Sequence, residues 1–129
     1  QRPGLDRRQV PSCTYCQPQV ASVGLTEQMA EDKGLEFKIG QFPYQASGKA
    51  QAIGEVDGFI KLIVGEPYGE ILGAHIIGVE ATELIAELSL AIAAELTLED
   101  IENTIHAHPT LSEMVHEAAG AIQGKAVHI

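Results

Sequence analysis

Cysteine is scarce in this sequence, which holds only Cys13 and Cys16 among 129 residues. Two cysteines cannot build the disulfide framework of a small secreted domain, so we expect a reducing compartment. Their C-x-x-C spacing is that of a redox pair, but a thioredoxin-type pair places its first cysteine at a helix N-terminus. Here the pair lies between Pro11 and Pro18, in a stretch expected to be extended. The pattern therefore favours two incidental cysteines.

Long hydrophobic runs are also missing. A membrane-spanning helix needs about 18 uninterrupted apolar residues. The longest apolar stretch, residues 84–96, is interrupted by Glu87 and Glu95. No apolar block follows the charged residues at the start, so we expect neither a membrane span nor a secretory signal in this sequence.

Positive charge is the third scarcity. Eight Lys and Arg residues face 18 Asp and Glu residues, which gives a net charge of −10. Nucleic-acid phosphates attract basic surfaces, so this balance argues against a nucleic-acid partner. It favours a basic protein partner, or it serves solubility alone. No glycine-rich phosphate loop occurs either, because Ser47-Gly48-Lys49-Ala50 lacks the required spacing.

The first part of the chain predicts an arm followed by strands. Residues 1–18 hold three prolines and three arginines, which is typical of a linker or extended arm. The alternation in residues 19–25 predicts a strand with Val20 and Val23 inward. A short helix capped by Thr26 follows, and residues 35–42 are expected to form a second strand.

A hairpin gives the clearest strand signal, after a polar, glycine-bearing loop expected over residues 43–55. Residues 58–64 and 70–77 lie on either side of a turn at residues 66–69, and both are rich in β-forming side chains. The residues expected on one face of its first strand are Ile60, Leu62 and Val64.

From about residue 80 the apolar spacing becomes helical. Residues 84–96 form a helix apolar enough to be covered on more than one side. Thr97 begins a short helix with a capping-box pattern, and residues 111–123 form a last helix ended by Gly124. Small side chains in that helix favour close packing of another backbone. Strands followed by helices predict an α+β fold: an antiparallel β-sheet of about four to five strands with helices packed on one face.

The stretch from His106 to Glu113 (H-A-H-P-T-L-S-E) carries most of the candidate chemistry. One interpretation is structural: Pro109 keeps His108 extended, and Glu113 bonds the Thr110 backbone in a capping box. The other is acid–base: the Glu113 carboxylate holds one imidazole nitrogen of His108 and leaves the other for a substrate. The two interpretations compete for one carboxylate, and local sequence leaves both open.

A metal site is a further alternative, using His106, His108 and His116. Zinc needs three or four convergent ligands with supporting hydrogen bonds, and H-x-H supplies two at most. We therefore expect no metal. His75 lies within a predicted strand between apolar residues, which is typical of a structural histidine.

The H-A-H-P-T-L-S-E stretch resembles the C-terminal signature of the dihydrolipoamide dehydrogenases, which belong to the FAD-dependent pyridine-nucleotide disulfide oxidoreductases. Further segments resemble that family in order along nearly the whole chain. They are Gln19-Val20-Ala21-Ser22-Val23-Gly24-Leu25-Thr26-Glu27, Gly58-Phe59-Ile60-Lys61-Leu62, Gly69-Glu70-Ile71-Leu72-Gly73-Ala74-His75-Ile76-Ile77-Gly78 and Ala81-Thr82-Glu83-Leu84-Ile85.

The resemblance implies that residues 19–129 are the interface (dimerisation) domain of a homodimer and that residues 1–18 arrive from a nucleotide-binding region. It implies that His108 is the acid–base residue for dihydrolipoamide at the other subunit's disulfide, oriented by Glu113, while His106 is structural. FAD and NAD would bind the parent enzyme and neither would bind this chain, which we expect to be inactive alone. The surfaces expected between the subunits are the helix over 84–96 and the last helix.

Two other expectations follow from the resemblance. The acidic surface would suit a basic subunit-binding domain of a 2-oxo acid dehydrogenase acyltransferase. The compartment would be the bacterial cytoplasm rather than a mitochondrial matrix. Glutathione reductases share H-P-T-x-x-E, so a related flavin disulfide reductase is the alternative within the family.

Overall fold

The computed structural model describes residues 4–122, which form one antiparallel sheet with helices packed against it. The strands are β1 (Ser12–Thr14), β2 (Val20–Gly24), β3 (Phe37–Pro43), β4 (Phe59–Gly65) and β5 (Ile71–Ile77), in the order β1-β2-β5-β4-β3. The helices are α1 (Glu27–Asp32), α2 (Gly48–Ile53), α3 (Ala81–Ala93), α4 (Leu98–Asn103) and α5 (Glu113–Ile122), with short 3-10 helices η1 (Arg7–Gln9) and η2 (Tyr44–Ala46).

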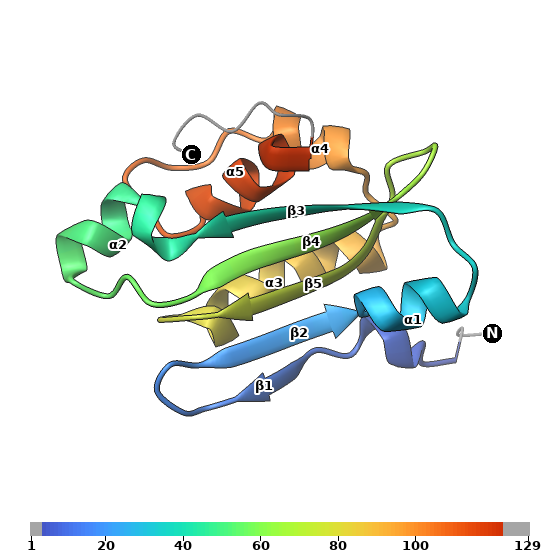
Figure 1. Ribbon diagram of the computed structural model, residues 1–129, viewed down its shortest axis with the longest axis horizontal. Coiled ribbons are helices and arrows are strands. Elements are labelled where there is room, and N and C mark those ends of the chain that lie inside the picture. The colour runs from blue at the N-terminus through green and yellow to red at the C-terminus, as the bar shows by residue number, and fades with distance from the viewer. Residues whose placement is uncertain (1–3, 123–129) are drawn as a thin grey trace.

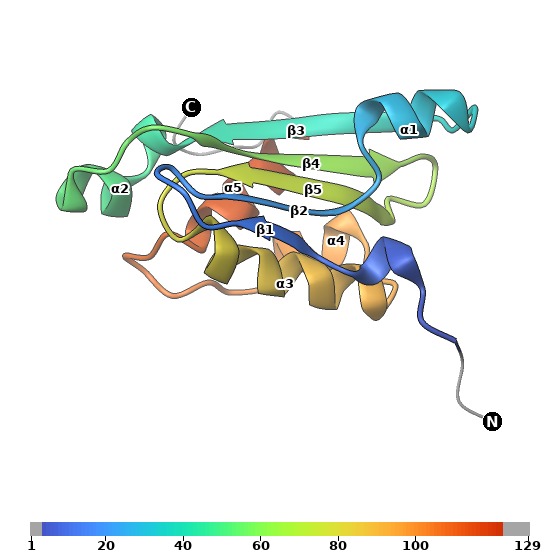
Figure 2. The same cartoon turned by 90° about the horizontal axis from the view of Figure 1, so that it is seen from below.

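The predicted α+β class is confirmed. Helices α3, α4 and α5 lie on one face of the five-stranded sheet, and α1 lies on the other (Figures 1 and 2). Among the residues that the structure describes, no helix has both the length and the apolar character needed to cross a bilayer.

The predicted hairpin is also confirmed. Strands β4 and β5 pair antiparallel, with Ile60 opposite Ile76 and Leu62 opposite Ala74. Ile60, Leu62 and Val64 are buried beneath the helices, as the alternation predicts. On the opposite face His75 has a structural role, because its Nε2 lies 3.0 Å from the carbonyl oxygen of Leu25 and donates a hydrogen bond to it.

Two predicted helix starts have the expected caps. The Thr26 hydroxyl accepts a hydrogen bond from the Met29 N–H at 3.1 Å. The Thr97 N–H donates to the Asp100 carboxylate at 2.8 Å. These short helices therefore begin where the local side-chain pattern places them.

The start of the sheet differs from the expectation. Residues 12–14, inside the stretch expected to be an arm, form β1 and pair with β2. The prediction that Val20 points inward is wrong, because Val20 is 38% exposed while Ala21 and Val23 are buried. The register explains the difference: Ala21 lies opposite the buried Ile76, so the residue before it faces the other side.

The segment expected to be a polar loop over residues 43–55 contains helix α2. The Ser47 hydroxyl accepts a hydrogen bond from the Ala50 N–H at 3.2 Å, and Gly54 ends the helix with φ 73°. The preceding turn is anchored by Tyr44, which is fully buried and donates from its hydroxyl to the Val79 carbonyl at 2.7 Å. Burial raises the pKa of this Tyr44 phenol, with a smaller contribution from negative Glu80.

Helix α5 lies very close to the edge strand β3. A Cβ atom added at Gly40 would lie 2.2 Å from the carbonyl oxygen of Ala118. Ala118, Ala119 and Gly120 are buried within this chain. These small residues let α5 pack closely on β3 of the same chain, as their size predicts. The expected contact of the last helix with a second subunit stays a prediction. Gly124, the predicted end of this helix, lies outside the described residues.

Gly40→Ala should destabilise the protein by about 1–3 kcal/mol, because the added methyl group meets backbone that cannot move without shifting α5. Gly48→Ala is the matched control, since nothing lies within 4 Å of its added Cβ. Urea unfolding monitored by circular dichroism measures both. Equal midpoints for the two variants would contradict the close packing of α5 on β3.

Candidate functional site

The candidate site lies on the segment between α4 and α5, at the N-terminus of α5. His108 precedes a cis peptide bond to Pro109, and its side chain is 75% exposed. Glu113 is the first residue of α5. The packing of α5 on β3 therefore sets the position of the carboxylate, and the carboxylate in turn faces His108.

The Glu113 carboxylate performs both of the tasks that the sequence leaves in competition. Each of its oxygens lies 2.9 Å from Nδ1 of His108, and Oε1 also accepts the Thr110 N–H at 2.9 Å. A carboxylate offers about four acceptor positions, so capping and imidazole binding are compatible. The Thr110 hydroxyl donates to the Ala107 carbonyl at 2.6 Å and lies 3.0 Å from the Ser112 hydroxyl.

This geometry sets the chemistry available to the His108 ring. An ionised carboxylate only accepts hydrogen bonds, so Nδ1 carries the hydrogen. The other nitrogen, Nε2, then holds the lone pair and belongs to a largely exposed ring. His108 is thus a surface base whose tautomer and orientation are set by the Glu113 carboxylate at Nδ1.

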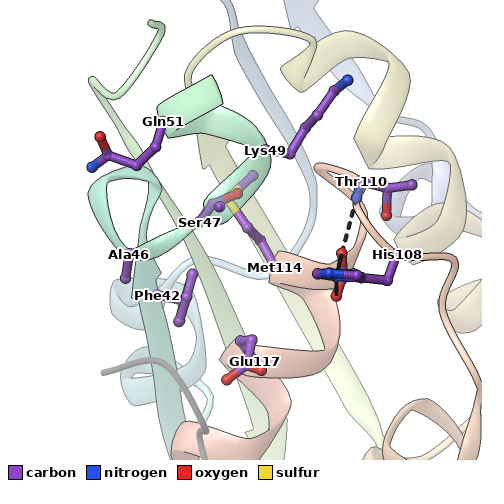
Figure 3. Close-up of a pocket in the computed structure, with 11 residues that line it drawn as sticks. Phe42, Ala46, Ser47, Lys49, Gln51, His108, Thr110, Met114 and Glu117 are labelled. Carbon is purple, nitrogen blue, oxygen red and sulfur yellow. Dashed lines mark hydrogen bonds and ion pairs between the residues drawn. The ribbon is translucent and has the colours of Figure 1, made fainter. Parts of the chain in front are cut away.

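A small hollow of about 230 Å³ lies beside His108, between α2 and α5. The side chains of Phe42 and Met114 are buried and form its apolar part (Figure 3). Ser47, Lys49 and Gln51 come from the region of α2. The sequence analysis did not predict that α2 lines this hollow, although Ser47 as a helix N-cap and Gly54 as a helix C-cap are signals of a short helix.

A second cluster of polar contacts surrounds His106, two residues before His108. The His106 side chain is 7% exposed, and its Nε2 lies 2.8 Å from the Glu87 carboxylate of α3. Its Nδ1 lies 3.1 Å from the Thr104 carbonyl oxygen. The ring also meets the edge of His116 at a centroid distance of 5.8 Å. These contacts match the predicted structural role of His106.

The same contacts bear on the metal alternative. Both nitrogens of His106 already face oxygen acceptors, and His116 Nε2 lies 3.2 Å from the Glu102 carbonyl oxygen. Across residues 4–122, no group of three or more His, Cys, Asp or Glu side chains is arranged to hold a metal ion. The alternative built on His106, His108 and His116 has no geometric support there.

The two cysteines lie away from this site. Cys13 belongs to β1, and the strand order places β1 and β3 at opposite edges of the sheet. Cys13 is half-buried and Cys16 is exposed, with its Sγ 3.0 Å from the Pro18 carbonyl oxygen. The hollow beside His108 borders the β3 edge, so the structure does not bring these thiols to the histidine.

Comparison with known proteins gives a consistent result. Residues 10–119 match the family described as pyridine nucleotide-disulphide oxidoreductase, dimerisation domain. The chain is 48% identical over 124 residues to the dihydrolipoyl dehydrogenase of Zymomonas mobilis, covering 96% of this chain and 27% of that protein. It is 49% identical to dihydrolipoyl dehydrogenase 2 of Haloarcula marismortui, covering 96% of this chain and 26% of that protein.

A solved structure agrees with the fold. The flavoprotein disulfide reductase RclA of Escherichia coli, in a Cu(II) complex, superposes with a TM-score of 0.84 at 26% identity, covering 88% of this chain and 26% of that one. The chain thus spans about a quarter of the length of the relatives that it matches. With the family match extending from β1 into α5, this chain belongs to the pyridine nucleotide-disulphide oxidoreductase dimerisation domain family.

Proposed function

We propose that this chain is the dimerisation domain of a dihydrolipoyl dehydrogenase and that it supplies His108 as the acid–base residue to the partner subunit's disulfide site. The observation that carries the proposal is the Glu113 carboxylate, which holds Nδ1 of His108 while leaving the ring 75% exposed. The relatives at 48–49% identity support the lipoamide branch over a glutathione reductase-like enzyme.

The chemistry follows from the pair's geometry. A thiolate attacks a disulfide far faster than a thiol does. Nε2 of His108 accepts the proton from a thiol of dihydrolipoamide, and Glu113 stabilises the positive ring that results. The thiolate sulfur then bonds to one sulfur of the enzyme's disulfide, and that S–S bond breaks to leave a thiolate. The disulfide belongs to residues outside this chain.

The sequence offers no dinucleotide-binding motif, since it has no glycine-rich phosphate loop. We therefore assign FAD and NAD to the rest of the parent enzyme, and the isolated chain is expected to be inactive.

The proposed homodimer is supported by apolar side chains that the chain leaves uncovered near the site. Ile105 is 97% exposed and adjoins His106, while Leu90 on α3 is 65% exposed. Leu90 lies one turn after Glu87, the partner of His106, so both apolar groups border the same contact. A second copy of the chain would cover them, and in the parent enzyme the partner subunit's disulfide would then face His108.

The acidic surface supports a second partner, a basic subunit-binding domain of a 2-oxo acid dehydrogenase acyltransferase. A net charge of −10 would attract such a domain at low ionic strength. Relatives from bacteria and archaea favour the cytoplasm as the compartment. Binding of a purified basic domain that does not weaken between 50 and 300 mM salt would contradict the electrostatic part of this proposal.

The dimer surface can be tested by charge. Leu90→Glu and Ile105→Glu together should shift the chain toward the monomer, because a dimer would bury both carboxylates unpaired. Analytical ultracentrifugation over a concentration series measures the shift. Met29→Glu is the control, since Met29 is 49% exposed and lies on α1, on the other face of the sheet. An unchanged dimer in the double variant would exclude this surface.

The acid–base role can be tested in the Zymomonas mobilis enzyme carrying this chain in place of its matching segment. His108→Gln should lower kcat for dihydrolipoamide by about 10²- to 10⁴-fold, as expected for loss of a general base, with flavin content unchanged. Glu113→Gln should lower kcat less, because the amide still accepts a hydrogen bond from the ring. His75→Gln, on β5, is the control. Wild-type turnover in the His108 variant would refute the assignment.

A further inference from the structure

We infer that His106 and Glu87 form a positioning pair that fixes the segment carrying His108, an inference that rests on the proposed function for its catalytic consequence. The two histidines are two residues apart and have opposite environments. The His106 side chain is 7% exposed and the His108 side chain is 75% exposed. The buried ring holds the segment to the helices, and the exposed ring faces outward.

The contacts of His106 tie three structural elements together. Nε2 reaches the Glu87 carboxylate on α3 at 2.8 Å, and Nδ1 reaches the Thr104 carbonyl oxygen, at the end of α4, at 3.1 Å. Both acceptors are satisfied at once only when both ring nitrogens carry hydrogen. The edge contact with His116 adds α5 as the third element.

The segment is therefore held on both sides of His108. Upstream, the Thr104 hydroxyl donates to the Asp100 carbonyl at 2.7 Å, which fastens the residue that His106 bonds. Downstream, Glu113 accepts the Thr110 N–H. Between these points, the Thr110 hydroxyl donates to the Ala107 carbonyl at 2.6 Å. Release of His106 would free the upstream side and let the His108 ring leave the line of the Glu113 carboxylate.

The pair lies in a strongly acidic neighbourhood. A hollow next to His106 is lined by Glu102, Glu113, His116 and Glu117 as well. Glu87 contacts the ring at Nε2, and it comes from α3, whereas the other carboxylates come from α4 and α5. The bond to Glu87 therefore joins α3 to the segment that carries His108.

Amide hydrogen exchange of the chain itself tests the positioning. Glu87→Ala should raise the exchange rate of the Thr110 N–H, which donates to Glu113, by about 10-fold or more relative to wild type. Glu87→Gln should give a smaller rise, because its amide oxygen still accepts from Nε2. Glu83→Ala, the same charge change one turn earlier on an exposed position of α3, should leave the rate unchanged.

The catalytic consequence is measured in the chimeric enzyme described above. Glu87→Ala should lower kcat by about 10-fold or more, as small misplacements of a catalytic group do, with flavin content and the KM for NAD unchanged. Equal Thr110 exchange in the Glu87→Ala and Glu83→Ala chains would overturn the positioning role. Unchanged kcat in the Glu87→Ala chimera would overturn its catalytic consequence.

The positioning role of His106 and Glu87 can fail or stand independently of the acid–base role of His108. If His108→Gln retains turnover while Glu87→Ala still accelerates Thr110 exchange, the acid–base role fails and the positioning stands. If Glu87→Ala accelerates every amide through global unfolding, His106→Gln replaces it, because that change leaves α3 intact. Thr110 exchange faster than in Glu83→Ala would then support the positioning role, and equal exchange would overturn it.

Discussion

The contact of α5 with β3 at Gly40 is the constraint on which the site depends. No side chain separates the strand from the Ala118 carbonyl, so the helix lies directly on the sheet. Because Glu113 is the first residue of that helix, the packing of α5 on the sheet sets the position of its carboxylate. The base is thus oriented by the same packing that completes the hydrophobic core.

The division of labour between the two histidines follows from this arrangement. Glu113 accepts from Nδ1 of His108 at the helix start, and Glu87 contacts the His106 ring two residues upstream. Two carboxylates, from α3 and α5, therefore bind two histidines of one short segment. The Glu113 carboxylate accepts hydrogen bonds from both the Thr110 N–H and the His108 ring.

Patterns confined to a few neighbouring residues were predictable from the sequence. The hairpin, the Thr26 cap and the Thr97–Asp100 box depend on local spacing, and all three are present. The orientation of Val20 was not, because an isolated alternating strand does not reveal which register its partner imposes. Helix α2 was missed because Gly48 and a polar composition outweighed the Ser47 cap. The Glu87–His106 contact joins residues 19 apart, and no local pattern signals it.

Strand β1 has a consequence for how copies of this chain associate. Exposed sheet edges attract further strands and promote open-ended aggregation. Here the β2 edge is covered by only three residues, whose exposed members are the polar Ser12 and Thr14. The far edge, β3, ends at Pro43, which lacks a donor for further pairing. Both margins therefore discourage growth of the sheet from molecule to molecule.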